Sequence, residues 1–164
     1  VDEIILFDEV IDIIKWYQAR EHLIIVVTNQ SGIERGFFSK ETVENIHTWI
    51  ISELKKSNCY IDKFYYCQHG PTTSPPCSCR KPEPGMILQA KKDFQLSLHE
   101  STMIGDKLSD MIAAYRSGIG KKYLISQEEI ISEKCYHDIH FRSHTNLINF
   151  IKANPGIEYH SPKE

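Results

Sequence analysis

Three cysteines and one histidine are the residues of this sequence whose types and spacing most clearly favour metal chemistry. Cys67 and His69 are separated by one residue, and Cys77 and Cys79 follow in a loop rich in proline. Thiolate and imidazole groups suit tetrahedral Zn²⁺, and four protein ligands leave no position for a catalytic water. We therefore predict a structural zinc site. The alternative interpretations are unligated cysteines beside a surface histidine, or a redox pair at Cys77 and Cys79.

The other two cysteines, Cys59 and Cys135, have core-like surroundings and are expected to pack in the interior. The total of five is odd and no secretory signal is visible, so a disulfide framework is not indicated. Both observations favour a reducing compartment, and we expect the protein in the cytoplasm.

Polar residues after a buried strand could bind a phosphate. Thr28 and Asn29 directly follow the apolar run at residues 23–27. A hydroxyl and successive backbone N–H groups at a strand end can hold an anion. Because polar residues end most buried strands, simple capping of the strand is the alternative interpretation.

Charged residues in two further segments could add to phosphate chemistry. Arg80 and Lys81 come directly after Cys79, so zinc binding at Cys79 would fix the direction of two positively charged side chains. Asp106 and Asp110 are four residues apart at the start of a predicted helix, and a carboxylate at a strand's carboxyl end can hold Mg²⁺. The alternatives are solvated surface charge for the cations and helix capping for Asp106. Together these residues indicate Mg²⁺-dependent phosphoryl chemistry.

The elements that must position these residues alternate between helix-like and strand-like patterns, which is typical of a doubly wound α/β fold with a parallel sheet. In such sheets ligands bind beyond the carboxyl ends of the strands, where the polar clusters fall. We expect a single domain over residues 1–164. Strands are predicted at residues 23–27, 61–67, 101–105 and 122–125, and helices at residues 9–19, 39–54, 84–94, 108–118 and 147–151.

Composition narrows the classes of partner. The chain of 164 residues is 41% hydrophobic and 25% charged, which is typical of globular proteins. Its net charge is 19 − 22 = −3, which is not the basic footprint of a nucleic-acid-binding domain. No apolar run approaches the ~20 residues of a membrane span. We expect a monomer that binds a small-molecule phosphosugar, with no nucleic-acid or membrane partner.

Four motifs of the sequence resemble the haloacid-dehalogenase (HAD) superfamily, and more narrowly its zinc-containing branch of heptose-bisphosphate and histidinol-phosphate phosphatases. The resemblance extends from about Asp8 to Ile151. It implies a HAD-like, Rossmann-type sheet with a zinc-binding loop, and Mg²⁺ and Zn²⁺ as cofactors. The motifs are T-N-Q-S-G at residues 28–32, C-Q-H at residues 67–69, C-S-C-R-K-P at residues 77–82 and G-D-K at residues 105–107.

The resemblance also implies a role for each matching residue. Thr28, Lys81 and Asp106 match the catalytic group: the threonine bonds the transferring phosphoryl group, the lysine neutralises its charge, and the aspartate binds Mg²⁺. Asp110 matches an acid that orients its neighbours. The residues expected to contact substrate are Thr28, Asn29, Gln30, Ser31, Arg80, Lys81 and Lys107, and those expected to bind zinc are Cys67, His69, Cys77 and Cys79.

One motif of the superfamily has no match. Its members begin with a strand ending in D-x-D-G-T, whose first aspartate is the nucleophile and whose second is the general acid, and no D-x-D precedes Thr28 here. Asp8 ends an apolar run, but Val10 stands where the second aspartate is needed, so we expect Asp8 to cap a helix.

We therefore expect the catalytic aspartates to be encoded before Val1. Residues 1–164 alone are then expected to be inactive, and their sheet to be interrupted between the strands that end at Thr28 and Gly105.

The function that these residues favour is Mg²⁺-dependent hydrolysis of a sugar bisphosphate, with D-glycero-D-manno-heptose 1,7-bisphosphate as the expected substrate. Two alternatives remain at this point. The same motifs could serve histidinol phosphate, or the chain could be a catalytically dead, zinc-stabilised protein that binds phosphosugars.

Overall fold

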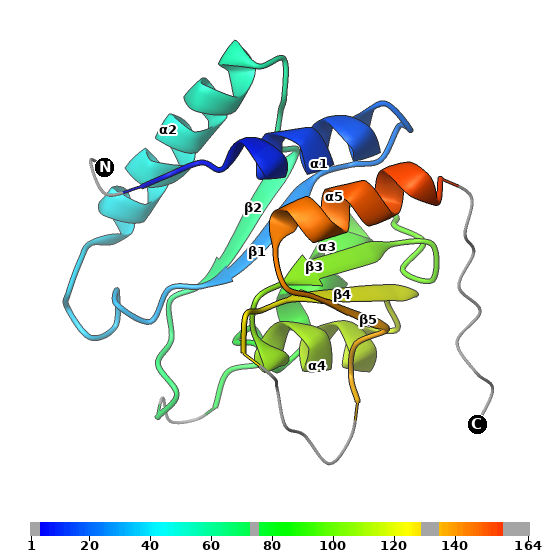
Figure 1. The fold of residues 1–164 in the computed structure, drawn as a ribbon. Coiled ribbons are helices and arrows are strands. Elements are labelled where there is room, and N and C mark those ends of the chain that lie inside the picture. Colours follow the sequence, from blue (N-terminus) through cyan, green and yellow to red (C-terminus); the bar gives the residue numbers. More distant parts are fainter. Residues whose placement is uncertain (1–3, 73–75, 129–134, 156–164) are drawn as a thin grey trace. The chain divides into compact units, whose positions relative to one another are not determined.

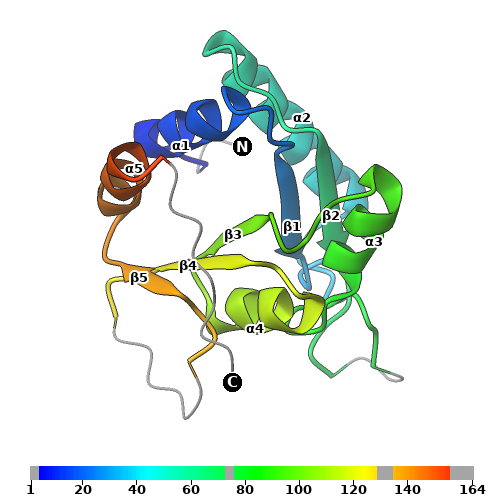
Figure 2. The same ribbon diagram turned by 90° about the vertical axis from the view of Figure 1, so that its right-hand side faces the viewer.

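Parallel strands and helices alternate through the computed structural model, which describes residues 4–72, 76–128 and 135–155. The chain divides after Arg80 into two units, and each is described by itself. Figures 1 and 2 show the elements of both units. No helix of the described residues is both long enough and apolar enough to cross a membrane.

The first unit is a β-α-β arrangement preceded by a helix. Its elements are α1 (Asp8–Gln18), β1 (Ile25–Asn29), α2 (Lys40–Lys56) and β2 (Lys63–Cys67). β1 and β2 are parallel, so Asn29 and Cys67 are partners at their carboxyl ends. Thus the predicted phosphate-binding residues and the first zinc ligand end adjacent strands.

Hydrophobic packing holds the helices of this unit together. Ile14 of α1, Leu54 of α2 and Cys59 form a buried cluster, against which Ile24 and Ile61 pack. α2 begins after Ser39, whose side chain accepts a hydrogen bond from the Thr42 N–H at 3.1 Å. This cap satisfies one of the free N–H groups at the helix start.

The second unit is a three-stranded parallel sheet in the order β3-β4-β5. α4 lies on one side of this sheet and α5 on the other, as Figure 1 shows. The side chains of Met111 on α4, Leu124 on β4 and Leu147 on α5 are fully buried. Its elements are α3 (Gly85–Phe94), β3 (Thr102–Gly105), α4 (Leu108–Ser117), β4 (Lys121–Ile125), β5 (Ile139–Phe141) and α5 (His144–Ala153).

The strands thus form two parallel sheets with flanking helices, as the predicted fold class requires. Among the described residues β1 pairs with β2, whereas β3 pairs with β4, so β1 and β3 belong to different sheets. The interruption predicted between the strands that end at Thr28 and Gly105 stays a prediction. The single-domain organisation stays a prediction.

Several local predictions are corrected. β1 begins at Ile25 rather than at Leu23, because the Ile24 N–H donates to the Asp62 carboxylate at 2.7 Å and not to a strand partner. Asp8 lies inside the first turn of α1, and Phe7 is its N-cap residue. Cys135 is exposed, not a core residue.

Two further observations concern the second unit. β5 was not predicted, since three residues with a central histidine carry too short an apolar pattern. α4 packs through Met111, Ala113 and Ala114, and Tyr115 on the same predicted helix is exposed.

Candidate functional site

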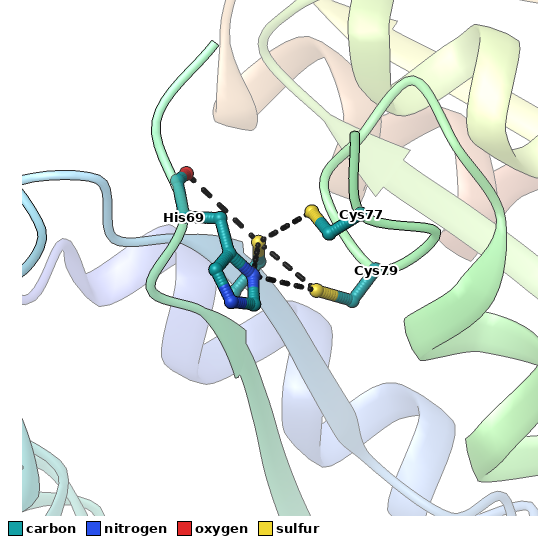
Figure 3. A group of neighbouring side chains, drawn as sticks. His69, Cys77 and Cys79 are labelled. Atoms are coloured by element: carbon teal, nitrogen blue, oxygen red, sulfur yellow. Dashed lines mark hydrogen bonds between the residues drawn. The ribbon is translucent and has the colours of Figure 1, made fainter. Parts of the chain in front are cut away.

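The predicted zinc ligands lie together at the end of β2. The donor atoms of Cys67, His69, Cys77 and Cys79 all lie within 4.8 Å of one another. Figure 3 shows the His69 ring and the sulfurs of Cys77 and Cys79 pointing toward one centre. Cys67 is buried, and the other three are half-buried.

The distances fit one tetrahedral metal ion. With Zn–S of about 2.3 Å and Zn–N of about 2.0 Å, tetrahedral donors lie roughly 3.5–3.8 Å apart. Here Cys67 Sγ lies 3.6 Å from Cys77 Sγ and 3.5 Å from His69 Nδ1, and His69 Nδ1 lies 3.4 Å from Cys79 Sγ. The Cys67 and Cys79 sulfurs, at 3.1 Å, are closer than this range and would have to separate around a bound ion. All five cysteines are free thiols. The donor set and spacing therefore suit Zn²⁺ with no open position.

The thiols of this cluster differ in acidity. Burial, and a side-chain hydrogen bond with Cys79 that favours the protonated thiol, raise the pKa of Cys67 to about 12. Burial acts in the same direction on Cys77, but hydrogen bonds from Cys79, the Arg80 backbone and Cys67 lower its pKa to about 7. Three adjacent thiols cannot all ionise without a cation, so a bound dication is what would make all three thiolates.

Hydrogen bonds tie the zinc loop to the segment that follows β1. The Gln30 N–H donates to the Cys67 carbonyl at 2.7 Å, and the Gly70 N–H donates to the Glu34 carboxylate. Arg80 Nη1 donates to the His69 carbonyl at 2.9 Å. One donor of Arg80, a predicted substrate-binding residue, is therefore used within the loop. Sequence reasoning missed Glu34, which no motif distinguishes from other surface glutamates.

Thr28 and Asn29 are the last two residues of β1, and Gln30 and Ser31 begin the loop after it. Gln30 Nε2 donates to Thr28 Oγ1 at 3.1 Å. Ser31 Oγ accepts a hydrogen bond from Arg35 Nη2 at 3.2 Å. Four of the seven residues predicted to contact substrate are thus consecutive at one strand end, and the side chains of two of them, Thr28 and Gln30, are bonded to each other.

In the second unit Lys81 and Asp110 form a buried ion pair. Lys81 Nζ lies 2.7 Å from Asp110 Oδ1, and the two side chains are only 11% and 6% exposed. The other carboxylate oxygen of Asp110 accepts from the Lys107 N–H at 3.1 Å, which caps α4. Asp110 therefore holds both the lysine and the start of the helix.

The chain turn between β3 and α4 leaves room for this carboxylate. A Cβ on Gly105 would lie 2.6 Å from the Asp110 Cβ and 2.7 Å from its Oδ2, so only glycine fits there. Asp106 and Lys107 follow Gly105 and are both exposed. Lys107 is the N-cap residue of α4, so the capping alternative for Asp106 is wrong.

The predicted phosphate-handling residues thus fall into two groups. Thr28, Asn29, Gln30, Ser31 and Arg80 belong to the first unit with the zinc ligands, and Lys81, Asp106, Lys107 and Asp110 belong to the second. Within each unit the residues of a group lie at the carboxyl ends of parallel strands or in the loops next to them. This is the position where ligands bind in α/β sheets.

Known proteins resemble this chain in sequence over most of its length. Residues 78–124 match the family described as HAD-hydrolase-like. The D-glycero-alpha-D-manno-heptose-1,7-bisphosphate 7-phosphatase of Campylobacter jejuni is 35% identical over 148 residues, 88% of this chain and 80% of that protein. The D-glycero-beta-D-manno-heptose-1,7-bisphosphate 7-phosphatase of Escherichia coli K12 is 38% identical over 130 residues, 76% of this chain and 68% of that protein.

Solved structures agree in fold. A HAD-like phosphatase from Mesorhizobium loti has a TM-score of 0.79 and 30% identity, covering 93% of this chain and 75% of that one. The D,D-heptose 1,7-bisphosphate phosphatase of B. bronchiseptica, solved with magnesium and phosphate, has a TM-score of 0.75 and 23% identity, covering 93% of this chain and 87% of that one. By sequence and fold together, this chain belongs to the HAD-like hydrolases, in the family of the D-glycero-D-manno-heptose-1,7-bisphosphate 7-phosphatases.

Proposed function

We propose that this protein hydrolyses the 7-phosphate of D-glycero-D-manno-heptose 1,7-bisphosphate. The observation that carries the proposal is the 35% identity to a phosphatase of that name over 88% of this chain. The cluster of Cys67, His69, Cys77 and Cys79 also supports the proposal. Its sequence motif resembles that of the zinc-containing branch of the superfamily, to which heptose-bisphosphate phosphatases belong. The relatives' names favour the sugar bisphosphate over histidinol phosphate.

In this proposal the chain's own residues bind the phosphoryl group and neutralise its charge. Phosphoryl transfer needs positioning and electrostatic stabilisation more than elaborate covalent chemistry. The Thr28 hydroxyl and the Asn29 side chain would donate to phosphoryl oxygens, and the Lys81 ammonium would balance their developing charge. Asp110 orients Lys81 and balances its charge, since Lys81 Nζ lies 2.7 Å from Asp110 Oδ1. Gln30, Ser31, Arg80 and Lys107 are proposed to face the rest of the substrate.

Two metal ions are proposed, with different roles. Zn²⁺ at the cysteine–histidine cluster is structural, because four protein ligands complete its shell. Asp106 is proposed as a Mg²⁺ ligand: it follows β3 directly, it is exposed, and a carboxylate oxygen is what this ion prefers. When bound there, Mg²⁺ would withdraw charge from the phosphoryl oxygens.

We further propose a cytoplasmic monomer with one HAD-like domain and no nucleic-acid partner. The net charge of −3 supports the absence of nucleic-acid binding, and the odd cysteine number supports a reducing compartment.

The test is phosphate release by the protein in its full natural length, with Mg²⁺, from heptose 1,7-bisphosphate and from histidinol phosphate in parallel. We expect release from the heptose bisphosphate only, and a rate at least about 100-fold lower for Lys81→Ala. Release from histidinol phosphate alone would replace the proposed substrate. Release from neither would contradict the phosphatase function.

A further inference from the structure

Gln30 touches both the predicted phosphate-binding threonine and a zinc ligand. We propose that Gln30 is a positioning residue, which orients the Thr28 hydroxyl so that its hydrogen points to the phosphoryl group. This inference rests on the proposed function and deepens it. It changes the role of Gln30 from direct contact with the substrate to control of the residue beside it.

The backbone of Gln30 is held on both sides. Its N–H donates to the Cys67 carbonyl at 2.7 Å, which extends the pairing of β1 with β2 by one residue. Its carbonyl accepts from the Ile33 N–H at 3.2 Å. The backbone therefore fixes where the Gln30 side chain starts, and only the ordering of the side chain itself opposes its bond to Thr28.

The side chain of Gln30 reaches back to Thr28. Side chains two residues apart in extended backbone lie on the same side, and Gln30 Nε2 donates to Thr28 Oγ1 at 3.1 Å. Both residues are half-buried, so water competes weakly for this bond. The contact is between two residues of the same phosphate-binding motif.

The direction of this bond determines what the hydroxyl can do next. A threonine hydroxyl has one hydrogen to donate and two lone pairs that accept. With one lone pair taken by the Gln30 amide, the hydrogen is directed away from Gln30. A phosphoryl group offers only acceptor oxygens, so a hydroxyl held as a donor is already in the state that binds it. A freely rotating hydroxyl would have to be ordered by the substrate.

The attachment also links this threonine to the zinc cluster. The carbonyl that holds the Gln30 backbone belongs to Cys67, one of the four predicted ligands. An ordered cluster thus fixes the residue that orients Thr28, within the first unit and without any contact between metal and substrate.

The experiment is a double-mutant cycle in the full-length protein, with Gln30→Met, Thr28→Val and the double variant. Affinity for inorganic phosphate is measured by calorimetry, and kcat and KM are measured with heptose 1,7-bisphosphate. Losing one hydrogen bond to a charged group lowers affinity by about tenfold or more. We expect a loss of phosphate affinity of this size for Thr28→Val. We expect a loss of about three- to tenfold for Gln30→Met, seen in kcat more than in KM, and no further loss when it is added to Thr28→Val.

Gln89→Met is the matched control, because Gln89 is an exposed glutamine of α3 bonded to Asp93. It should leave phosphate affinity and kcat within about twofold of the unchanged protein. If Gln30→Met does not fold, Gln30→Glu takes its place. Its carboxylate can only accept, so it would draw the Thr28 hydrogen toward itself, and Thr28→Val should remove part of its effect.

A second readout does not depend on phosphate. In the NMR spectrum, Thr28→Val should shift the side-chain amide signal of Gln30 and leave that of Gln89 unchanged. An unmoved Gln30 signal, or an equal loss from Gln30→Met with and without the Thr28 hydroxyl, overturns the positioning role alone. If the unchanged protein neither binds phosphate nor turns over the heptose bisphosphate, the proposed function is overturned, and the positioning role of Gln30 with it.

Discussion

At the scale of single residues, the Lys81–Asp110 pair makes the sharpest stability prediction. Removing one partner of a buried ion pair leaves the other charge without compensation, at roughly 3–5 kcal/mol. We expect Asp110→Ala to lower the free energy of unfolding by about this amount, and Lys81→Met/Asp110→Ala to lower it by less than the two single changes summed. Urea unfolding measures these values.

Asp110→Asn separates the two contacts of this carboxylate. The amide oxygen can still accept from the Lys107 N–H, which Asp110 bonds at 3.1 Å, but it cannot balance the lysine charge. We expect Asp110→Asn to lose most of the free energy of unfolding that the ion pair contributes and little of the part that the helix cap contributes. Additive effects of Lys81→Met and Asp110→Ala would show that the pair is not coupled.

The zinc ligands give a second prediction at this scale. Cys77→Ser removes one of four donors that lie within 4.8 Å of one another, so the protein should lose its bound zinc. Cys135→Ser is the control, because Cys135 is exposed and outside the cluster. Zinc measured by elemental analysis should be one per chain in the unchanged protein and in Cys135→Ser. Stoichiometric zinc in Cys77→Ser would contradict the assignment.

At the scale of elements, His47 couples the packing of α2 on β2 to pH. Its ring stacks on Phe64 with a centroid distance of 4.1 Å. Burial lowers the pKa of His47 below its ordinary 6.5, and Glu44 partly opposes this. The folded state therefore prefers the neutral ring, so this contribution to stability is present above pH 6.5 and is lost as the pH falls through the lower folded pKa.

His47→Phe keeps the stacked ring and removes the titration. We expect the free energy of unfolding to fall less between about pH 7.5 and about pH 5.5 in His47→Phe than in the unchanged protein. The pKa of His137 is also lowered, by burial and by His140. Because the variant and the unchanged protein share His137 and the zinc ligands, comparing the two proteins at equal pH cancels the acid sensitivity of both. Parallel pH profiles of the two proteins would exclude a role for His47.

At the scale of the whole molecule, removal of zinc should act mainly on the first unit, because all four ligands belong to it. We expect a chelator to speed hydrogen exchange at the Gln30 and Gly70 amides, which bond the Cys67 carbonyl and the Glu34 carboxylate. The Ser126 amide, which bonds the Phe141 carbonyl in the second unit, is the internal control. Unchanged exchange at Gln30 would mean that zinc does not order the segment after β1.

What the sequence determined by itself was mostly local. The zinc ligands could be predicted because they lie within thirteen positions around a single loop, so their spacing alone brings them together. The helices and the four longer strands could be predicted because periodic apolar residues mark the faces they bury. Motif resemblance supplied the family, which the relatives then bore out.

Only the tertiary structure decided contacts between residues that are distant in sequence or that compete for one donor. β1 begins two residues later than predicted because the Asp62 carboxylate accepts from the Ile24 N–H. Lys81 is paired with Asp110, whereas the sequence also allowed it to be a solvated surface charge. β5 exists because β4 provides a partner for a three-residue strand too short to predict. Local spacing limits which residues can meet along a helix or a loop, but burial and pairing across the fold determine which of them do.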